Sequence, residues 1–175
     1  EQLESLLKMP GLSAIEIDVD AIEDNYNTLL ESTTEQINTI HQQGKSVVIY
    51  TSRVEKSFDS QSERLDFGMM VSDFLMDIVR QLPETLGFLI SKGGITSNDV
   101  LSKGLRLQTS RVVGQILAGC SVVRCPAYHQ RFADLPVVIF PGNVGNADSL
   151  ARAYQYLALQ HDTDSQTLAS AVKIA

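Results

Sequence analysis

A lysine and two glycines lie between a strongly apolar segment and a helix-start pattern, and together they could bind a phosphate. Lys92, Gly93 and Gly94 follow the apolar run, and Thr96 with Asp99 three residues later is typical of a helix N-cap and first turn. Backbone N–H groups and the dipole at a helix N-terminus favour a bound anion. Glycine lets the backbone approach the anion, and the lysine adds a positive charge. The segment therefore predicts a phosphate or nucleotide site.

The same residues also have a plain structural explanation, because glycine pairs are common in short connections between strands and helices. The segment matches neither the P-loop pattern GxxxxGK[ST] nor the dinucleotide-binding pattern GxGxxG. A second glycine-bearing segment, residues 141–148, again leads from an apolar run into a helix start, with Asn146 or Asp148 as the cap. Ligands of open α/β sheets bind outside the carboxyl ends of the strands, so the two segments could line one crevice.

The elements that must position these segments follow from the hydrophobic pattern. The expected strands cover residues 13–18, 46–51, 87–90, 105–109, 112–117, 121–125 and 136–140. The expected helices cover residues 2–8, 20–44 with a break near 31–34, 67–82, 96–103 ended by Gly104, 148–160, and a short helix after 161. This order predicts a single layered α/β/α domain over residues 1–175, with a mostly parallel central sheet and a small antiparallel addition.

Composition and charge exclude several classes of protein. The net charge of −7 and the pI near 4.9 argue against nucleic acid or an anionic membrane as the main partner. No apolar run approaches the length of a membrane span. Cys120 and Cys125 lie five positions apart, on opposite faces of one expected strand. Both are therefore predicted to be reduced packing residues of a cytoplasmic protein rather than a disulfide pair.

Three segments, in this order along the chain, resemble the C-terminal, nucleotide-binding half of the four-carbon acid sugar kinase family, which has also been described as Hrp-dependent type III effector (Hop) proteins. The segments are residues 90–100, 114–119 and 135–145; residues 2–4 and 47–52 also fit, and the similarity extends to about Leu157. The resemblance implies a kinase that uses ATP and Mg²⁺ to phosphorylate sugar acids of the tetronate type. It implies a two-domain protein, of which this chain would be the C-terminal fragment.

The resemblance and the residues together assign nucleotide contacts to ten positions, which are Lys92, Gly93, Gly94, Ile95, Thr96, Ser97, Gly142, Asn143, Val144 and Gly145. Many family members have an acidic residue in place of Ile95 and Asn-Phe in place of Asn143-Val144, so Ile95 is compatible only with contact through the backbone. By the same resemblance, the absent N-terminal domain would hold most of the sugar-acid site. We expect the catalytic base in that domain too, since none is identifiable here.

Other charged residues are expected to have ordinary roles. Asp18 and Asp20 resemble a two-carboxylate metal pair, but they lie where a strand becomes a helix and are better explained by capping. The three histidines have no ligand-like spacing, so no metal site is predicted. Arg53 and Lys56 could meet a phosphate or the absent domain. Basic residues that could flank the crevice, but are expected to be solvated, are Lys103, Arg124 and Arg131.

Two other functions stay open at this point. The effector name suggests a non-catalytic interaction module, which would show no nucleotide affinity and an exposed apolar patch. The other function is an α/β domain that binds a phosphosugar or a different nucleotide. The sugar acid and the oligomeric state, including a homo-oligomer, are not predicted by these residues.

Overall fold

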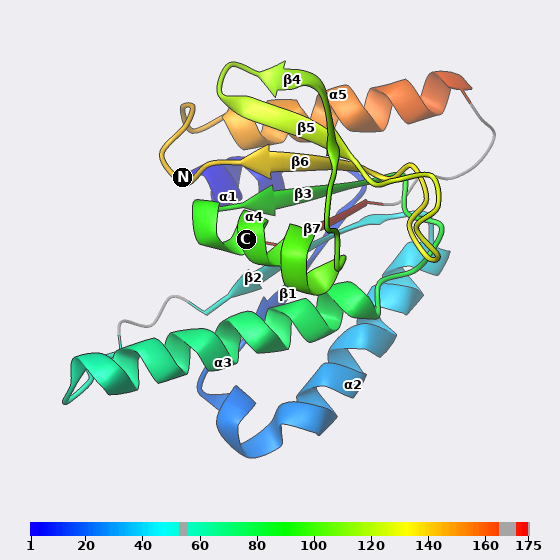
Figure 1. Cartoon of the computed structure of the whole chain (residues 1–175). Coiled ribbons are helices and arrows are strands. Elements are labelled where there is room, and N and C mark those ends of the chain that lie inside the picture. Colours follow the sequence, from blue (N-terminus) through cyan, green and yellow to red (C-terminus); the bar gives the residue numbers. More distant parts are fainter. Residues whose placement is uncertain (53–55, 165–170, 175) are drawn as a thin grey trace.

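The computed structural model describes the backbone of residues 1–52, 56–164 and 171–174, and the side chains as far as residue 159. Figure 1 shows the arrangement of its elements. In chain order they are α1 (Gln2–Leu7), β1 (Leu12–Ile17), α2 (Ala21–Gln42), β2 (Ser46–Thr51), α3 (Gln61–Arg80), β3 (Phe88–Lys92), α4 (Gly94–Asp99), the π-helical turn η1 (Val100–Gly104), β4 (Arg111–Leu117), β5 (Cys120–Arg124), β6 (Pro136–Phe140), α5 (Ser149–Asp164) and β7 (Ala171–Ile174).

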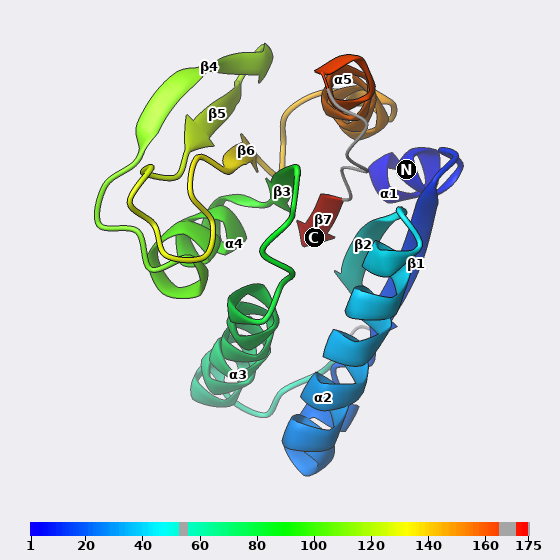
Figure 2. The ribbon, with the colours of Figure 1, turned by 90° about the vertical axis from the view of Figure 1, so that its right-hand side faces the viewer.

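Within the described residues, the strands form one seven-stranded sheet in the order β1-β2-β7-β3-β6-β5-β4. The strands from β1 to β6 in this order pair in parallel, while β5 is antiparallel to β6 and β4 is antiparallel to β5. The predicted parallel sheet with an antiparallel addition is therefore confirmed. The strand β7 lies between β2 and β3 and pairs with both, so it joins the two halves of the sheet (Figures 1 and 2).

Helices cover both faces of the sheet, as the α/β/α prediction requires (Figure 2). One apolar cluster joins residues of α2, α3 and η1 to one face, and a second cluster joins residues of α1 and α5 to the other. In β1, Ile15 and Ile17 are buried while Glu16 between them is exposed, which is the alternation that the sequence predicted. Among the described residues, no helix is both long and apolar enough to cross a membrane.

Two helices differ from their predicted limits. The helix α3 begins at Gln61 rather than Phe67, because the Ser60 side chain accepts a hydrogen bond from the Glu63 N–H at 3.2 Å and caps it. This serine with a glutamate three residues later is a capping box, whose signal the polar composition of the segment concealed. The helix α2 continues through residues 31–34, so the predicted break is wrong; its backbone is non-helical at Asn25 instead.

The helix after β3 also starts earlier than predicted. Its N-cap is Gly93 and its first residue is Gly94, so the prediction that Thr96 is the N-cap is wrong. The helix then widens into the π-helical turn η1, which ends at Gly104. A Cβ atom on Gly104 would lie 2.7 Å from Val79 Cγ1 of α3. Glycine is therefore required here by close packing against α3 rather than by a left-handed C-terminal cap.

We expect Gly104→Ala to destabilise the fold by about 2 kcal/mol, because the added methyl group must displace Val79 in a packed core. Gly68→Ala is the matched control, since nothing lies within 4 Å of a Cβ atom on Gly68 in α3. That substitution should raise the stability by about 0.5–1 kcal/mol through helix propensity. Urea unfolding of both variants measures the difference; equal stabilities would contradict the packing explanation.

Two predicted elements are absent or different. Residues 105–109 form no strand: Arg106 has a positive φ of 54°, and the Leu107 N–H donates to the Leu101 carbonyl across the loop. Beyond residue 161, where a short helix was predicted, the helix α5 continues to Asp164 and residues 171–174 form the strand β7; residues 165–170 lie outside the described residues. The residues of β7 form a strand because they pair with β2 and β3, and local composition does not reveal this pairing.

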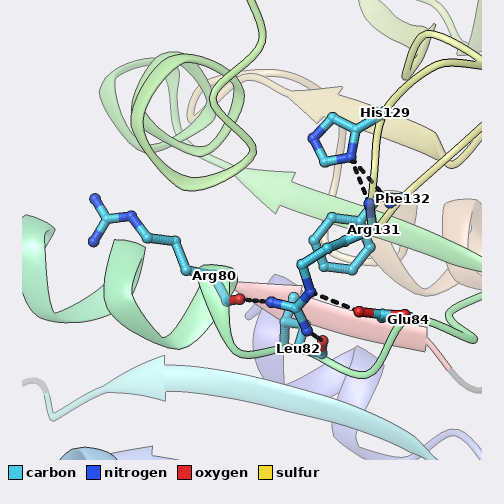
Figure 3. A network of polar contacts seen from close by, with 6 residues as sticks. All are labelled: Arg80, Leu82, Glu84, His129, Arg131 and Phe132. Carbon is cyan, nitrogen blue, oxygen red and sulfur yellow. Dashed lines mark hydrogen bonds and ion pairs between the residues drawn. The ribbon is translucent and has the colours of Figure 1, made fainter.

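The loop between β5 and β6 is attached to the C-terminal end of α3 by one arginine (Figure 3). The Arg131 guanidinium donates to the Arg80 carbonyl and, at 2.9 Å, to the Leu82 carbonyl, and it forms an ion pair with Glu84 at 3.0 Å. The last carbonyl groups of a helix lack partners within the helix, so the guanidinium satisfies them. The prediction that Arg131 is merely solvated is therefore wrong.

His129 holds the same loop from inside (Figure 3). Its Nδ1 atom accepts hydrogen bonds from the N–H groups of Arg131 at 3.3 Å and Phe132 at 3.0 Å. Its Nε2 atom lies 2.8 Å from the Leu105 carbonyl and so must carry the proton that it donates. The loop that leads into β6 is thus fixed on two sides.

Candidate functional site

The two glycine segments lie side by side at the carboxyl ends of two neighbouring strands. We call residues 92–97 the first glycine loop and residues 141–146 the second glycine loop. They follow β3 and β6, which are adjacent parallel strands with Lys92 in register with Phe140. The Gly93 N–H donates to the Phe140 carbonyl at 2.8 Å, so the first loop begins while it is still attached to the end of β6. The two loops are therefore neighbours, as a shared crevice would require.

The chain leaves these two strands toward opposite faces of the sheet. After β3 it continues into α4 and η1, and the buried residues of η1 belong to the cluster on the α2–α3 face. After β6 it continues into α5, which packs on the other face (Figures 1 and 2). Adjacent parallel strands whose connections separate in this way form a topological switch point, where α/β sheets bind their ligands. The two glycine loops flank this point.

Lys92 connects the two loops through its ammonium group. Its Nζ atom donates to the Pro141 carbonyl at 3.0 Å and the Gly142 carbonyl at 2.8 Å, and it lies 4.9 Å from the centroid of the Phe140 ring. Burial lowers the pKa of Lys92 below its usual value. An ammonium has three N–H donors, of which the carbonyl groups use two. The third donates to neither of these carbonyl groups.

Three glycines leave the backbone of the loops open. Gly93 has a φ of 108°, a conformation that side-chain-bearing residues rarely adopt. No atom lies within 4 Å of a Cβ atom built on Gly94 or Gly142. Ile95 is 82% exposed, so its side chain makes little contact with the rest of the domain. Space for a ligand group therefore lies directly against the main chain of both loops.

The three polar residues predicted to contact the nucleotide, Thr96, Ser97 and Asn143, are exposed to solvent to different extents. Ser97 is 2% exposed, and its hydroxyl donates to the Ser91 carbonyl at 3.1 Å, so its side chain anchors the first glycine loop to β3. Thr96 is half-buried beside Gly93, with its Oγ1 atom 3.4 Å from a Cβ atom built there. Asn143 of the second glycine loop is exposed. Among these three side chains, those of Thr96 and Asn143 are accessible to a ligand.

The second glycine loop is held by Ser149 and Gln2, to which the sequence pattern assigned no contact with this loop. Ser149 Oγ accepts from the Asn146 N–H and donates to Asn146 Oδ1, both at 2.9 Å. Gln2 Nε2 donates to the Val144 carbonyl at 3.0 Å and the Asn146 carbonyl at 2.9 Å. Asn146 is one of the two caps that the sequence offered, and Ser149 contacts it from the position three residues later that Glu or Gln occupies in a capping box. No local signal could reveal Gln2, because its contact depends on how α1 docks.

The turn between β4 and β5 packs against the second glycine loop. A Cβ atom on Gly119 would lie 3.3 Å from Val144 Cγ1, and Gly119 has a φ of 79°. Burial raises the pKa of the adjacent Cys120 thiol, although the charge of Lys92 opposes the shift. All three segments that resemble the kinase family, residues 90–100, 114–119 and 135–145, therefore meet at one place.

Both cysteines are free and buried, as predicted. Cys120 belongs to the apolar cluster on the α5 face and Cys125 to the cluster on the α3 face, so the two side chains point to opposite faces of the sheet. Burial, with a further contribution from Asp134, raises the pKa of Cys125 to about 11. A thiol with so high a pKa is a poor nucleophile at neutral pH. Cys125 is therefore a packing residue.

The carboxylates proposed as alternatives have structural partners. The Asp20 N–H donates to Asp18 Oδ1 at 3.1 Å, and Asp20 forms an ion pair with Lys56 at 2.6 Å. Lys56 also lies 4.3 Å from the centroid of the Phe67 ring, while Arg53 lies outside the described residues. Across the part of the chain that the structure describes, no three His, Cys, Asp or Glu side chains are grouped as a metal site would require.

Asp99, at the end of α4, is turned into the domain. Burial alone would raise its pKa, but hydrogen bonds from Ser72, at 2.6 Å, and from Lys103 outweigh this and lower the pKa below its usual value. Lys103 is exposed, as predicted, and its Nζ atom lies 3.3 Å from the same carboxylate, with which it forms an ion pair. The carboxylate holds α4 against α3 and is not directed at the glycine loops.

Comparison with models of protein families matches residues 1–150 to one family, described as "Nucleotide-binding C-terminal domain". The matched residues run from α1 to the start of α5 and include both glycine loops and the turn between β4 and β5. A search of curated proteins found no match to the chain.

Proposed function

Because the chain belongs to the family of nucleotide-binding C-terminal domains, which is the domain family of four-carbon acid sugar kinases, we propose that it binds ATP for such a kinase. The reaction would transfer the γ-phosphoryl group of ATP to a sugar acid of the tetronate type, in the cytoplasm. The observation that supports this best is the pair of glycine loops at the switch point between β3 and β6.

Within this proposal, the two loops bind the phosphates of ATP. Gly94 and Gly142 leave room for phosphate oxygens to approach the main chain, and Lys92 supplies the positive charge from between the loops. Transfer of a phosphoryl group needs positioning and charge neutralisation more than covalent help from the protein. The first glycine loop and its lysine provide both without a nucleophilic side chain.

Mg²⁺ would accompany the nucleotide. Magnesium keeps several waters and is usually held by one or two carboxylates together with substrate phosphates, so it needs no dedicated protein cage. The described side chains offer no group of three potential ligands. The ion would be held mainly by the phosphates of ATP, where it supplies charge neutralisation. The sugar-acid site and the base that activates its hydroxyl would lie in the N-terminal domain of the full-length protein.

Isothermal titration calorimetry with Mg-ATP tests the nucleotide site. We expect Gly94→Asp and Gly142→Asp each to weaken binding at least tenfold, because each places a carboxylate where the phosphates should lie. Gly68→Asp is the matched control: it too introduces Asp where nothing lies within 4 Å of the Cβ atom, but on α3, outside the loops. Nucleotide binding that is unchanged in both loop variants would contradict the site assignment.

A ligand panel distinguishes the alternatives. A specific ligand raises the apparent stability of the domain by mass action, so thermal unfolding with ATP, ADP, GTP and phosphosugars ranks the candidates. The proposal requires the adenine nucleotides to give the largest shift. A phosphosugar that stabilises the domain more than ATP would favour the rival binding function, and the absence of any nucleotide shift would favour a non-catalytic module. Phosphorylation of four-carbon acids by the full-length protein tests the activity itself.

A further inference from the structure

A long segment of this acidic chain carries no carboxylate. Between Asp99 and Asp134 the sequence contains neither Asp nor Glu, whereas the whole chain has 21 of them and a net charge of −7. The same segment holds five basic residues, which are Lys103, Arg106, Arg111, Arg124 and Arg131. It forms η1, the β4–β5 hairpin and the loop that follows. Positive charge is therefore concentrated on one part of the fold.

Two of these arginines lie directly opposite each other in the sheet. Arg111 of β4 and Arg124 of β5 are register partners of an antiparallel pair, so their side chains leave the same face. Like charges in this position destabilise a sheet. The Arg124 guanidinium donates to the Asp134 carbonyl at 2.9 Å, and within the described part of the chain neither guanidinium forms an ion pair with a carboxylate. The contact of Arg124 with the Asp134 carbonyl gives that residue a place in the fold, but it does not neutralise either charge.

The arginine pair lies at the junction of two clefts. A cleft of about 380 Å³ is lined by both arginines and by Tyr128, which is 81% exposed. A cleft of about 850 Å³ between β4 and α5 shares Arg124 and Asp134 with it and is lined by Val113 and Tyr156 as well. We call these two clefts together the arginine groove. Exposed arginine and aromatic side chains, with few carboxylates, are typical of protein interfaces.

The open edge of the sheet borders the arginine groove. Among the described strands, β4 is the last in the sheet and pairs only with β5, so its other edge has backbone groups without a partner in any described strand. Residues 111–115 of this strand are all exposed, and Val112 is 65% exposed. An extended peptide can add to such an edge through main-chain hydrogen bonds. The groove thus offers main-chain, apolar and cationic contacts along one line.

We propose that the arginine groove binds an extended acidic segment of a partner protein. Carboxylates of the segment would pair with Arg111 and Arg124, and its apolar side chains would pack on Val113, Tyr128 and Tyr156. A second copy of this chain fits less well, because a symmetric contact would bring the same arginines of both copies into one interface. The two arginines lie where β5 ends and β6 begins, at the opposite end of β6 from the second glycine loop, and the larger cleft runs from there along β4 as far as Ile116.

Fluorescence anisotropy with a labelled octapeptide of alternating Glu and Val tests the proposal. We expect Arg111→Glu to weaken binding at least tenfold, whereas Arg64→Glu, an equal charge change at an exposed position of α3, should change it less than twofold. The matching Lys-Val peptide should not bind. Thermal unfolding separates binding from folding: Arg111→Glu places an opposite charge across from Arg124, so its stability should equal or exceed that of the wild type.

Four outcomes would overturn the proposal. They are unchanged affinity in Arg111→Glu, equal binding of the lysine peptide, complete displacement of the acidic peptide by millimolar inorganic phosphate, and a dimer in sedimentation that Arg111→Glu dissociates. The third would indicate a site for small anions and the fourth an interface between copies of this chain. None of these measurements involves a nucleotide, so their result is independent of the glycine loops.

Discussion

Replacing Val172 by proline is expected to reduce the free energy of unfolding by about 4 kcal/mol, because proline in a central strand removes a ladder hydrogen bond and clashes with the neighbouring strand. Val172 lies in β7 and is in register with Val47 of β2 on one side and Leu89 of β3 on the other. The backbone of β7 is the only connection between the two halves of the described sheet. Chemical denaturation monitored by circular dichroism measures the loss.

Val113→Pro is the control for this prediction. Val113 lies in the edge strand β4 at a register shift, where Val112 and Gly114 are paired but Val113 is not. Proline is tolerated at bulges and edges, so this variant should stay within about 1 kcal/mol of the wild type. If both proline variants unfold at the same denaturant concentration, β7 does not contribute to the sheet as the pairing indicates.

Gly145→Ala is expected to destabilise the domain by about 3 kcal/mol, from a left-handed backbone conformation and a clash together. Gly145 has a φ of 80°, and a Cβ atom there would lie 2.4 Å from Ser149 Oγ and 2.5 Å from Ser149 Cβ. The Ser149 hydroxyl cannot move aside without losing both hydrogen bonds to Asn146. The start of α5 and the second glycine loop should therefore loosen together.

Gly142→Ala separates this effect from a general intolerance of the loop. No atom lies within 4 Å of a Cβ atom on Gly142, so the free energy of unfolding of this variant should match that of the wild type within about 0.5 kcal/mol. Urea unfolding gives the difference, and amide hydrogen exchange at Asn146 and Ser149 locates it. Equal stability of Gly145→Ala and Gly142→Ala would show that the Ser149 side chain moves aside at little cost and that the loop is not rigid.

The parts of the fold that the sequence predicted have strong local patterns. The run Val47–Ile49 is apolar and β-branched, and it forms the buried strand β2 as such runs do in parallel sheets. The spacing of Val112 to Leu117 and Ser121 to Cys125 predicted the antiparallel pair β4–β5. Each of these elements needs only its own residues and near neighbours to be recognised.

The elements that were missed depend on distant residues or on weak polar signals. The strand β7 exists because β2 and β3 leave a space between them, which no local pattern encodes. The predicted strand over residues 105–109 has the right composition, but the left-handed backbone at Arg106 and the contacts of its loop prevent pairing. The early start of α3 was concealed because Ser60 and Glu63 lie in a polar segment that also suits a loop.

The candidate site was predictable in its position but not in its construction. Two glycine segments after two apolar runs placed it at the ends of β3 and β6, where the structure has them. The sequence suggested that Lys92 faces a phosphate, yet two of its three donors hold the second glycine loop. Ser97 likewise serves the loop from inside. Side chains near a binding site often shape the backbone that makes the contact, and spacing alone does not distinguish the two roles.

The position of β7 has a consequence for how the chain folds during synthesis. Its register pairs Val47 with Val172, so strands from nearly opposite ends of the described chain must meet before the sheet is continuous. Contacts between residues so far apart in sequence slow folding, because a long loop must close first. Until the ribosome has released β7, the facing edges of β2 and β3 are open and prone to aggregate. Nascent chains of this protein should therefore depend on chaperones until β7 has left the ribosome.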